Sequence, residues 1–166
     1  MDKVQKNLTD VERKLGKANK IVAKGSAMSL GDAIKLGRKS NSITSTIRKG
    51  IKEYDGTTPT DEESKKVLVI MQTIVDETEA QLDLLVKNKP HFEKLHVGGL
   101  VKKNMGKTQA ASLDLSKVML EKAPANLKEE AEALEKRRGA AFAKATAAFE
   151  GLTGGEDQAD GEDDSD

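Results

Sequence analysis

Residues 84–124 read LLVKNKPHFEKLHVGGLVKKNMGKTQAASLDLSKVMLEKAP and divide the chain into helices. A helical pattern reaches Pro90, loses its period over residues 91–99, resumes at Leu100 and stops again at Pro124. Proline lacks an amide donor and clashes with the preceding turn, so each proline closes a helix, and the glycine pair before Leu100 lets the backbone turn. This stretch therefore predicts long helices separated by short connections.

The composition predicts a single all-α domain. A chain of 166 residues is long enough to bury one sizeable core. Aromatic residues make up only 2% and Trp is absent, so the core must be built from aliphatic side chains, which suit helix packing better than sheets. The 34% of charged residues fits amphipathic helices with solvated outer faces.

Apolar periodicity and capping signals give five helices and no strand. Ser29 with Asp32, and Thr60 with Glu63, have the spacing of capping boxes, and Asn126 is the expected cap of the last helix. We expect helices at about residues 3–24, 30–54, 61–87, 100–122 and 127–149. The predicted architecture is a five-helix bundle over residues 1–152.

The C-terminal residues 153–166 are predicted to be a disordered acidic tail. Residues 156–166 contain seven acids and no base, while residues 1–52 hold thirteen Lys or Arg against four acids. A Gly/Asp/Glu segment without apolar anchors cannot bury enough surface to fold, so we expect it to promote solubility or to screen charge loosely.

Most catalytic, metal and cofactor chemistries are excluded by the residues present. Without cysteine the chain has no disulfide, thiolate nucleophile or Cys-ligated metal. His91 and His96 lie five residues apart in a connection, where surface positions are expected and a metal site with Glu93 is a weak pattern. We therefore predict no enzyme, no cofactor and no metal site, and no apolar run is long enough for a transmembrane segment.

Nucleic acid binding is a competing interpretation of the basic segment at residues 1–52. Phosphate binding requires such a patch, but no aromatic side chains are interleaved for base stacking, and the acidic tail would compete with phosphate. Solvated lysines on helix surfaces explain the charge equally well, and we predict no nucleic acid partner.

The helix predicted over residues 30–54 has an unusual inner face. Ser40, Asn41 and Ser42 interrupt it where leucines would be expected. Such a face either approaches a neighbouring backbone closely or borders a partly polar cavity, and the alternative is a less buried helix. Met71, Met105 and Met119 on other inner faces suit either ordinary core packing or an irregular ligand-binding wall.

The sequence resembles the fungal hydrophobic surface-binding protein A and cell-wall galactomannoprotein family. The resemblance rests on the Lys89-Pro90-x-Phe92 segment, on residues 98–101 (GGLV), on residues 120–124 (LEKAP), and on the F-x-x-A-x-x-x-F spacing of residues 142–149. It implies a secreted or cell-wall, non-enzymatic, all-α domain whose relatives coat hydrophobic surfaces and recruit lytic enzymes, or enclose long-chain fatty acids.

We therefore predict that the bundle binds a long-chain fatty acid or related lipid in an elongated internal apolar cavity. The candidate lining residues occupy inner helical phases: Ile34, Ile47, Met71, Ile74, Met105, Leu115, Met119 and Phe142. The candidate head-group residues are hydroxyls near those phases, or arginines at a cavity mouth: Ser40, Thr44, Thr108, Ser112, Arg38 and Arg48.

Two other functions remain open. One is a surface-active adhesin that coats hydrophobic surfaces, recruits a lytic enzyme and holds no stable internal ligand. The other is a helical interaction or effector protein without a ligand. Lipid binding and adsorption to hydrophobic beads separate these possibilities.

Overall fold

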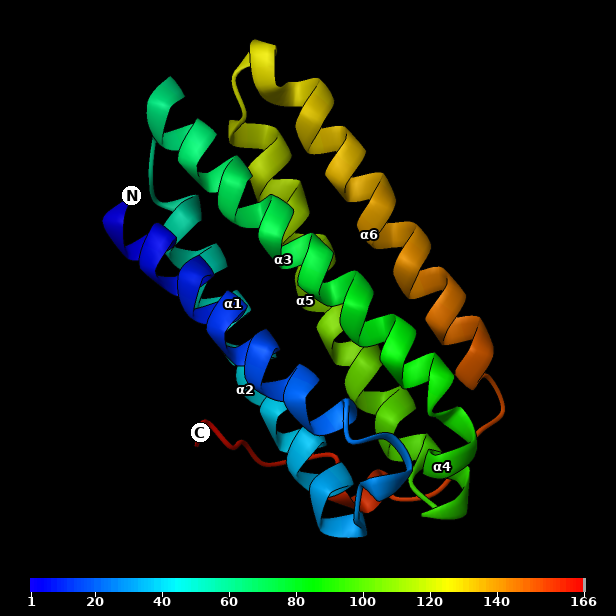
Figure 1. Cartoon of the computed structure of the whole chain (residues 1–166). Coiled ribbons are helices and arrows are strands. Elements are labelled where there is room, and N and C mark those ends of the chain that lie inside the picture. Colours follow the sequence, from blue (N-terminus) through cyan, green and yellow to red (C-terminus); the bar gives the residue numbers. More distant parts are fainter. Residues whose placement is uncertain (166) are drawn as a thin grey trace.

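The computed structural model describes residues 1–165 and contains five long helices (Figure 1). A short helix and three single-turn 3₁₀ segments complete the described secondary structure, which includes no strand. The helices are α1 (Asp2–Val22), α2 (Leu30–Asp55), α3 (Asp61–Lys87), α4 (Lys89–Lys94), α5 (Gly98–Lys122) and α6 (Lys128–Phe149), and the 3₁₀ segments are η1 (Gly25–Ala27), η2 (Ala125–Leu127) and η3 (Glu156–Gln158). The predicted all-α class and five long helices are confirmed.

Both predicted capping boxes are present. At the start of α2, the Asp32 amide donates to the Ser29 hydroxyl at 3.0 Å, and the Ser29 amide donates to the Asp32 carboxylate at 3.0 Å. Thr60 and Glu63 make the same reciprocal pair at the start of α3. The predicted Asn126 cap is wrong, because η2 precedes α6 and the N-cap of α6 is Leu127, with no side-chain cap.

The connection between α3 and α5 differs from the sequence prediction. Pro90 lies in the first turn of the short helix α4, where its missing amide is tolerated. Phe92 on α4 is fully buried against Phe149, with ring centroids 6.3 Å apart. α5 begins at Gly98 rather than at Leu100. Glycine is favoured at residue 99 because a Cβ there would lie only 2.8 Å from the backbone nitrogen of Gly154.

The five long helices form a closed ring around one aliphatic core. α1 packs against α2 and α3, α2 also packs against α5, and α6 completes the ring between α5 and α3 (Figure 1). Each long helix thus has two principal neighbours. α3 packs against α1 and α6 within this ring and also contacts the short helix α4.

The acidic segment follows a defined path, whereas the sequence predicted disorder over residues 153–166. It crosses the start of α5, where the Leu100 amide donates to the Gly154 carbonyl at 2.9 Å, and then runs beside α2 (Figure 1). Ala159 is fully buried beneath this crossing. The sequence could not show that α1 and α2 present cations to this segment, and Asp166 lies outside the described residues.

Candidate functional site

A small cavity lies inside the ring, between α2, α3, α5 and α6. It measures about 30 Å³, which is enough for a water molecule and far below the roughly 300–1,000 Å³ of typical ligand pockets. A cavity of this volume is not the elongated one that we predicted, because packed side chains fill the rest of the interior. The lining residues are Ala33, Leu36, Gly37, Ser40, Gln81, Leu82, Leu85, Leu100, Val101, Asn104, Met105, Thr108 and Phe142.

One part of the cavity wall carries a cluster of three hydroxyls. The Thr108 hydroxyl donates to the Asn104 carbonyl one turn earlier, at 3.1 Å. Because a hydroxyl has a single proton, Thr108 must then accept from both Ser40 and Thr44, whose oxygens lie 3.1 Å away. This cluster ties α2 to α5 and leaves each hydroxyl with a partner.

Two buried amides beside this cluster lack hydrogen-bond partners. Gln81 on α3 and Asn104 on α5 are 8% and 3% exposed, and both line the cavity. Among the described residues, nothing pairs with the Gln81 Nε2 or with either polar atom of the Asn104 side chain. A buried polar group without a partner costs about 1–3 kcal/mol, so two such residues at one cavity are unusual for a purely structural core.

The tight meeting of α2 and α5 holds Asn104 in place. A Cβ on Gly37 would lie only 2.6 Å from the Asn104 Nδ2 and 3.4 Å from a Leu100 methyl group. Glycine at this position therefore lets the two helices approach closely enough to enclose the amide. This contact also explains the weak apolar pattern of α2, since Gly37 and Ser40 face the cavity rather than solvent.

A buried guanidinium lies next to the cavity residue Phe142. Arg138 is 5% exposed, its Nε and Nη2 donate to Glu135 at 3.0 and 2.7 Å, and its guanidinium carbon lies 5.7 Å from the Phe142 ring centroid. Its Nη1 has no partner among the described residues. Burial raises the pKa of Glu135, but hydrogen bonds from Arg138 and Ser116 outweigh it and leave that pKa below its ordinary value.

The structure brings some of the predicted site residues to this cavity. Met105 and Phe142 line it, as do Ser40 and Thr108, and Thr44 bonds to Thr108. The other lining candidates do not border the cavity: Ile47, Met71, Ile74, Leu115 and Met119 are buried in the core, and Ile34 is half-buried against it. For these residues, contact with a lipid stays a prediction.

The predicted head-group arginines do not reach the cavity. Arg38 and Arg48 are exposed, and Arg48 forms an ion pair with Asp114 of α5 on the outer surface. Ser112 is half-buried on α5 and does not line the cavity. Their helical phase places the arginines on the solvent side of α2.

The sequence analysis missed Gln81 and Asn104, although the pattern contains a signal for both. Asn104 lies four residues from Leu100 and four from Thr108, and Gln81 lies seven residues from Ile74. Both amides therefore occupy apolar phases of their helices, where a polar side chain needs an explanation.

The described residues can be compared with the requirements of a metal site and of a membrane-spanning helix. These residues contain no cluster of three His, Asp or Glu that could hold a metal ion. The His91 ring nitrogen lies 2.7 Å from the Met28 carbonyl, and His96 is exposed. No described helix combines the length and the apolar character needed to cross a bilayer.

Comparison with protein families gives one decisive match. The model described as hydrophobic surface binding protein A matches residues 1–121, which is more than half of the chain. The chain belongs to this family. The match ends at residue 121, within α5. Of the segments on which the resemblance rests, the last three residues of the 120–124 segment and all of residues 142–149 therefore lie outside the match.

Solved structures show the same fold. Afmp4p in complex with palmitic acid has a TM-score of 0.83 at 20% identity, over 88% of this chain and 97% of that chain. Ligand binding domains 2 and 1 of the Penicillium marneffei MP1 protein, both complexed with arachidonic acids, have TM-scores of 0.83 and 0.79 at 21% and 22% identity. They cover 92% and 87% of this chain and 96% and 94% of their own. No curated protein sequence gives a significant match.

Proposed function

We propose that this protein binds a long-chain fatty acid or a related lipid between its helices, without catalysing a reaction. The observation that carries the proposal is the pair of unpartnered amides, Gln81 and Asn104, in the wall of an otherwise largely apolar cavity. An amphipathic ligand with one polar end and a long apolar body matches such a wall. The palmitic and arachidonic acid complexes of proteins with the same fold support this ligand class.

The amides supply the polar contacts that a carboxylate head group needs. The Gln81 Nε2 and the Asn104 Nδ2 are donors, and a carboxylate accepts only. Hydrogen bonds to an ionised acceptor are roughly twice as strong as neutral ones, so a head group here offsets the cost of the unpartnered amides. We assign the head-group role to these two residues, with Ser40 and Thr108 beside them.

The acyl chain requires the ring of helices to widen. A cavity of about 30 Å³ admits none of it, so the chain must replace contacts between packed side chains. We infer that α6 is the helix most easily displaced, because its packing against α3 and α5 is less extensive than the packing between the other neighbouring long helices. We place the acyl chain along the seams that α6 makes with α3 and α5.

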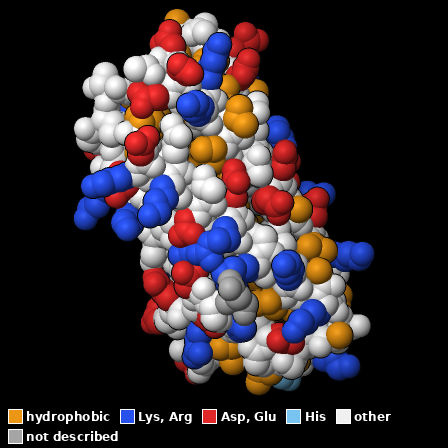
Figure 2. Space-filling model, turned by 60° about the vertical axis from the view of Figure 1, so that its left-hand side comes forward, with side chains coloured by type: hydrophobic (Ala, Val, Ile, Leu, Met, Phe, Trp, Pro, Cys, Tyr) orange, Lys and Arg blue, Asp and Glu red, His pale blue; other side chains and the backbone are white. Residues whose placement is uncertain are grey.

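A secreted or cell-wall location is part of this proposal, supported by membership of the hydrophobic surface binding protein A family. The family description also favours a second function, adsorption to hydrophobic surfaces. Recruitment of a lytic enzyme belongs to the same alternative and stays a prediction. The closed bundle offers little surface for it. The exposed large hydrophobic residues, Leu30, Val69 and Leu113, lie on three different helices, and hydrophobic side chains form only scattered spots on the face in Figure 2. Adsorption would therefore require the same opening of the ring as lipid entry.

Native mass spectrometry and calorimetry test the proposal directly. We expect protein purified without added lipid to carry mass in the fatty-acid range, or delipidated protein to bind palmitate or arachidonate at a defined stoichiometry. A chain that carries no lipid and takes up neither acid refutes the carrier function. If that chain still adsorbs to hydrophobic beads, the adhesin is correct, and if it does neither, a helical interaction or effector protein remains.

A further inference from the structure

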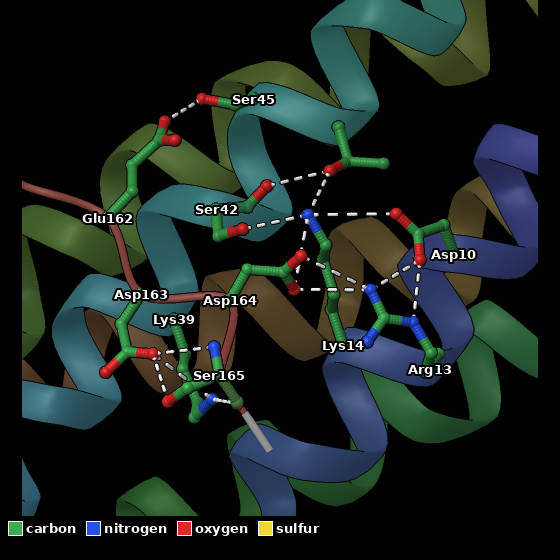
Figure 3. Close-up of polar contacts among 11 residues, drawn as sticks. Asp10, Arg13, Lys14, Lys39, Ser42, Ser45, Glu162, Asp163, Asp164 and Ser165 are labelled. Atoms are coloured by element: carbon green, nitrogen blue, oxygen red, sulfur yellow. Dashed lines mark hydrogen bonds and ion pairs between the residues drawn. The ribbon is translucent and has the colours of Figure 1, made fainter.

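Two lysines, Lys14 of α1 and Lys39 of α2, lie between these two helices and do not line the cavity (Figure 3). The Lys14 ammonium donates to the hydroxyls of Ser42 and Thr46 at 2.8 and 2.7 Å. Lys39 is only 4% exposed. Two ammonium groups held so close to buried surface are unfavourable unless anions accompany them.

The anions come from the acidic segment at the end of the chain. The Asp163 carboxylate lies 3.7 Å from the Lys39 ammonium, which also donates to the Ser165 carbonyl. The Asp164 carboxylate lies 3.6 Å from the Lys14 ammonium and 3.2 Å from the Arg13 guanidinium (Figure 3). Asp10 on α1 contributes the other carboxylate near Lys14, at 3.7 Å.

The backbone of the segment is recognised as well as its charges. The Asn41 amide donates to the carbonyls of Ala159 and Gly161 at 2.6 and 2.8 Å, and the Asp163 amide donates to the Arg38 carbonyl at 3.2 Å. Ser45 donates to the Glu162 carboxylate. Hydrogen bonds to main-chain groups at fixed positions hold the acidic segment in one register against α2. Attraction between opposite charges alone would not fix that register.

We propose that α1 and α2 form a binding site for an extended acidic peptide segment, and that residues 159–165 fill this site as a ligand in cis. The proposal explains why the basic charge of the chain gathers in residues 1–52 while its acids gather at the other end. It does not depend on lipid binding. A carboxylate-rich segment of another protein fits the same site and must displace the tail, whose attachment gives it a high local concentration.

A full-length chain with a neutralised tail tests the site. In the variant E162Q/D163N/D164N the tail loses its anchoring carboxylates while every helix is retained. The probe is a fluorescent synthetic peptide with the sequence of residues 156–166, followed by anisotropy. We expect it to bind this variant at least about tenfold more tightly than it binds the unchanged chain, with an affinity that falls as salt rises.

Substitutions within the neutralised-tail variant identify the residues that bind. Lys39→Gln should weaken peptide binding at least about tenfold, while Lys65→Gln, the same change at an exposed position of α3, should leave it within about twofold. If Lys39→Gln unfolds the bundle, the half-buried Asn41→Leu, which removes both carbonyl contacts, takes its place.

Three results would overturn the proposal. The first is the absence of peptide binding to a folded neutralised-tail variant. The second is equal binding of a peptide with the same composition in scrambled order, which would mean that only diffuse charge is recognised. The third is an equal loss of affinity from Lys65→Gln and Lys39→Gln.

Discussion

Replacing Asn104 by leucine distinguishes the effect of its unpartnered amide on folding stability from its proposed effect on fatty-acid affinity. Leucine branches at Cγ as asparagine does, so it fits beside Gly37 while it removes two buried polar atoms that lack partners. Each such atom costs about 1–3 kcal/mol, and exchange for an apolar group of the same shape is neutral or stabilising. We expect Asn104→Leu to stabilise the ligand-free protein by at least about 1–3 kcal/mol, the cost of one such atom, which raises Tm by roughly 2–4 °C per kcal/mol in a chain of this length.

The same substitution should weaken fatty-acid binding. A hydrogen bond to a charged group contributes about 1.5–3 kcal/mol, which corresponds to roughly 10- to 150-fold in Kd. Calorimetric melting of delipidated protein measures the first effect, and isothermal titration with palmitate measures the second. Gain of stability together with loss of affinity is the signature of a polar group kept for a ligand.

Ser64 supplies the matched control. It is buried on α3 with an unpartnered hydroxyl, and it does not line the cavity. Ser64→Ala should therefore change stability without changing the Kd for palmitate. The reasoning is refuted if Asn104→Leu destabilises the free protein and leaves its Kd unchanged, because the amide would then have a structural partner and no ligand role.

Three further predictions concern the scaffold. Burial raises the pKa of Tyr54 to about 12, so its ultraviolet titration should have a midpoint near 12 in folded protein and near 10 in denaturant. The stability that the neutral phenol contributes below about pH 10 should be lost as the pH rises from about 10 to about 12. Thr60→Ala removes the capping hydroxyl of α3 and should cost about 1 kcal/mol in denaturant unfolding, whereas Thr58→Ala in the preceding connection should cost little. Arg48→Gln breaks only the exposed pair with Asp114, so the Kd for palmitate should stay within about twofold, and a larger loss would return Arg48 to the head-group site.

Helix positions could be predicted from the sequence because local chemistry sets them. The capping boxes at Ser29 and Thr60 and the turn at residues 55–60 act within a few residues of the chain. The Asn126 cap was predicted wrongly because Pro124 is followed by a 3₁₀ turn before α6, and no side chain caps that junction. α5 begins at Gly98, two residues before the predicted start, and no side chain caps its first turn.

The candidate site was only partly predictable. Ser40 and Thr108 were found because hydroxyls interrupt apolar stripes, and Met105 and Phe142 because they lie in inward phases. Whether an inward-facing residue borders a cavity or is tightly packed depends on which side chains of the neighbouring helices lie against it. The helical periodicity of the sequence does not give this information. Met71 illustrates the limit, since it is as buried as predicted and does not line the cavity.

The acidic segment shows a different limit of composition. Seven acids without an apolar anchor predict disorder when the segment is considered alone. Its contacts are nevertheless specific, because Lys14 and Lys39 are brought together only when α1 packs on α2. A count of charges can suggest such a pairing, but only the packed helices determine its register.

Under the proposed function, the small cavity and its unpartnered amides together account for how a lipid would be retained. In the free protein the amides of Gln81 and Asn104 lack protein partners, and this raises the free energy of the folded state. A bound carboxylate removes that cost only in the complex, so the penalty in the free state is added to the binding free energy. The acyl chain must part packed helices both to enter and to leave, which slows both steps without changing that difference. The arrangement therefore favours a ligand that exchanges slowly, and the head-group amides govern its affinity more than its rate of entry.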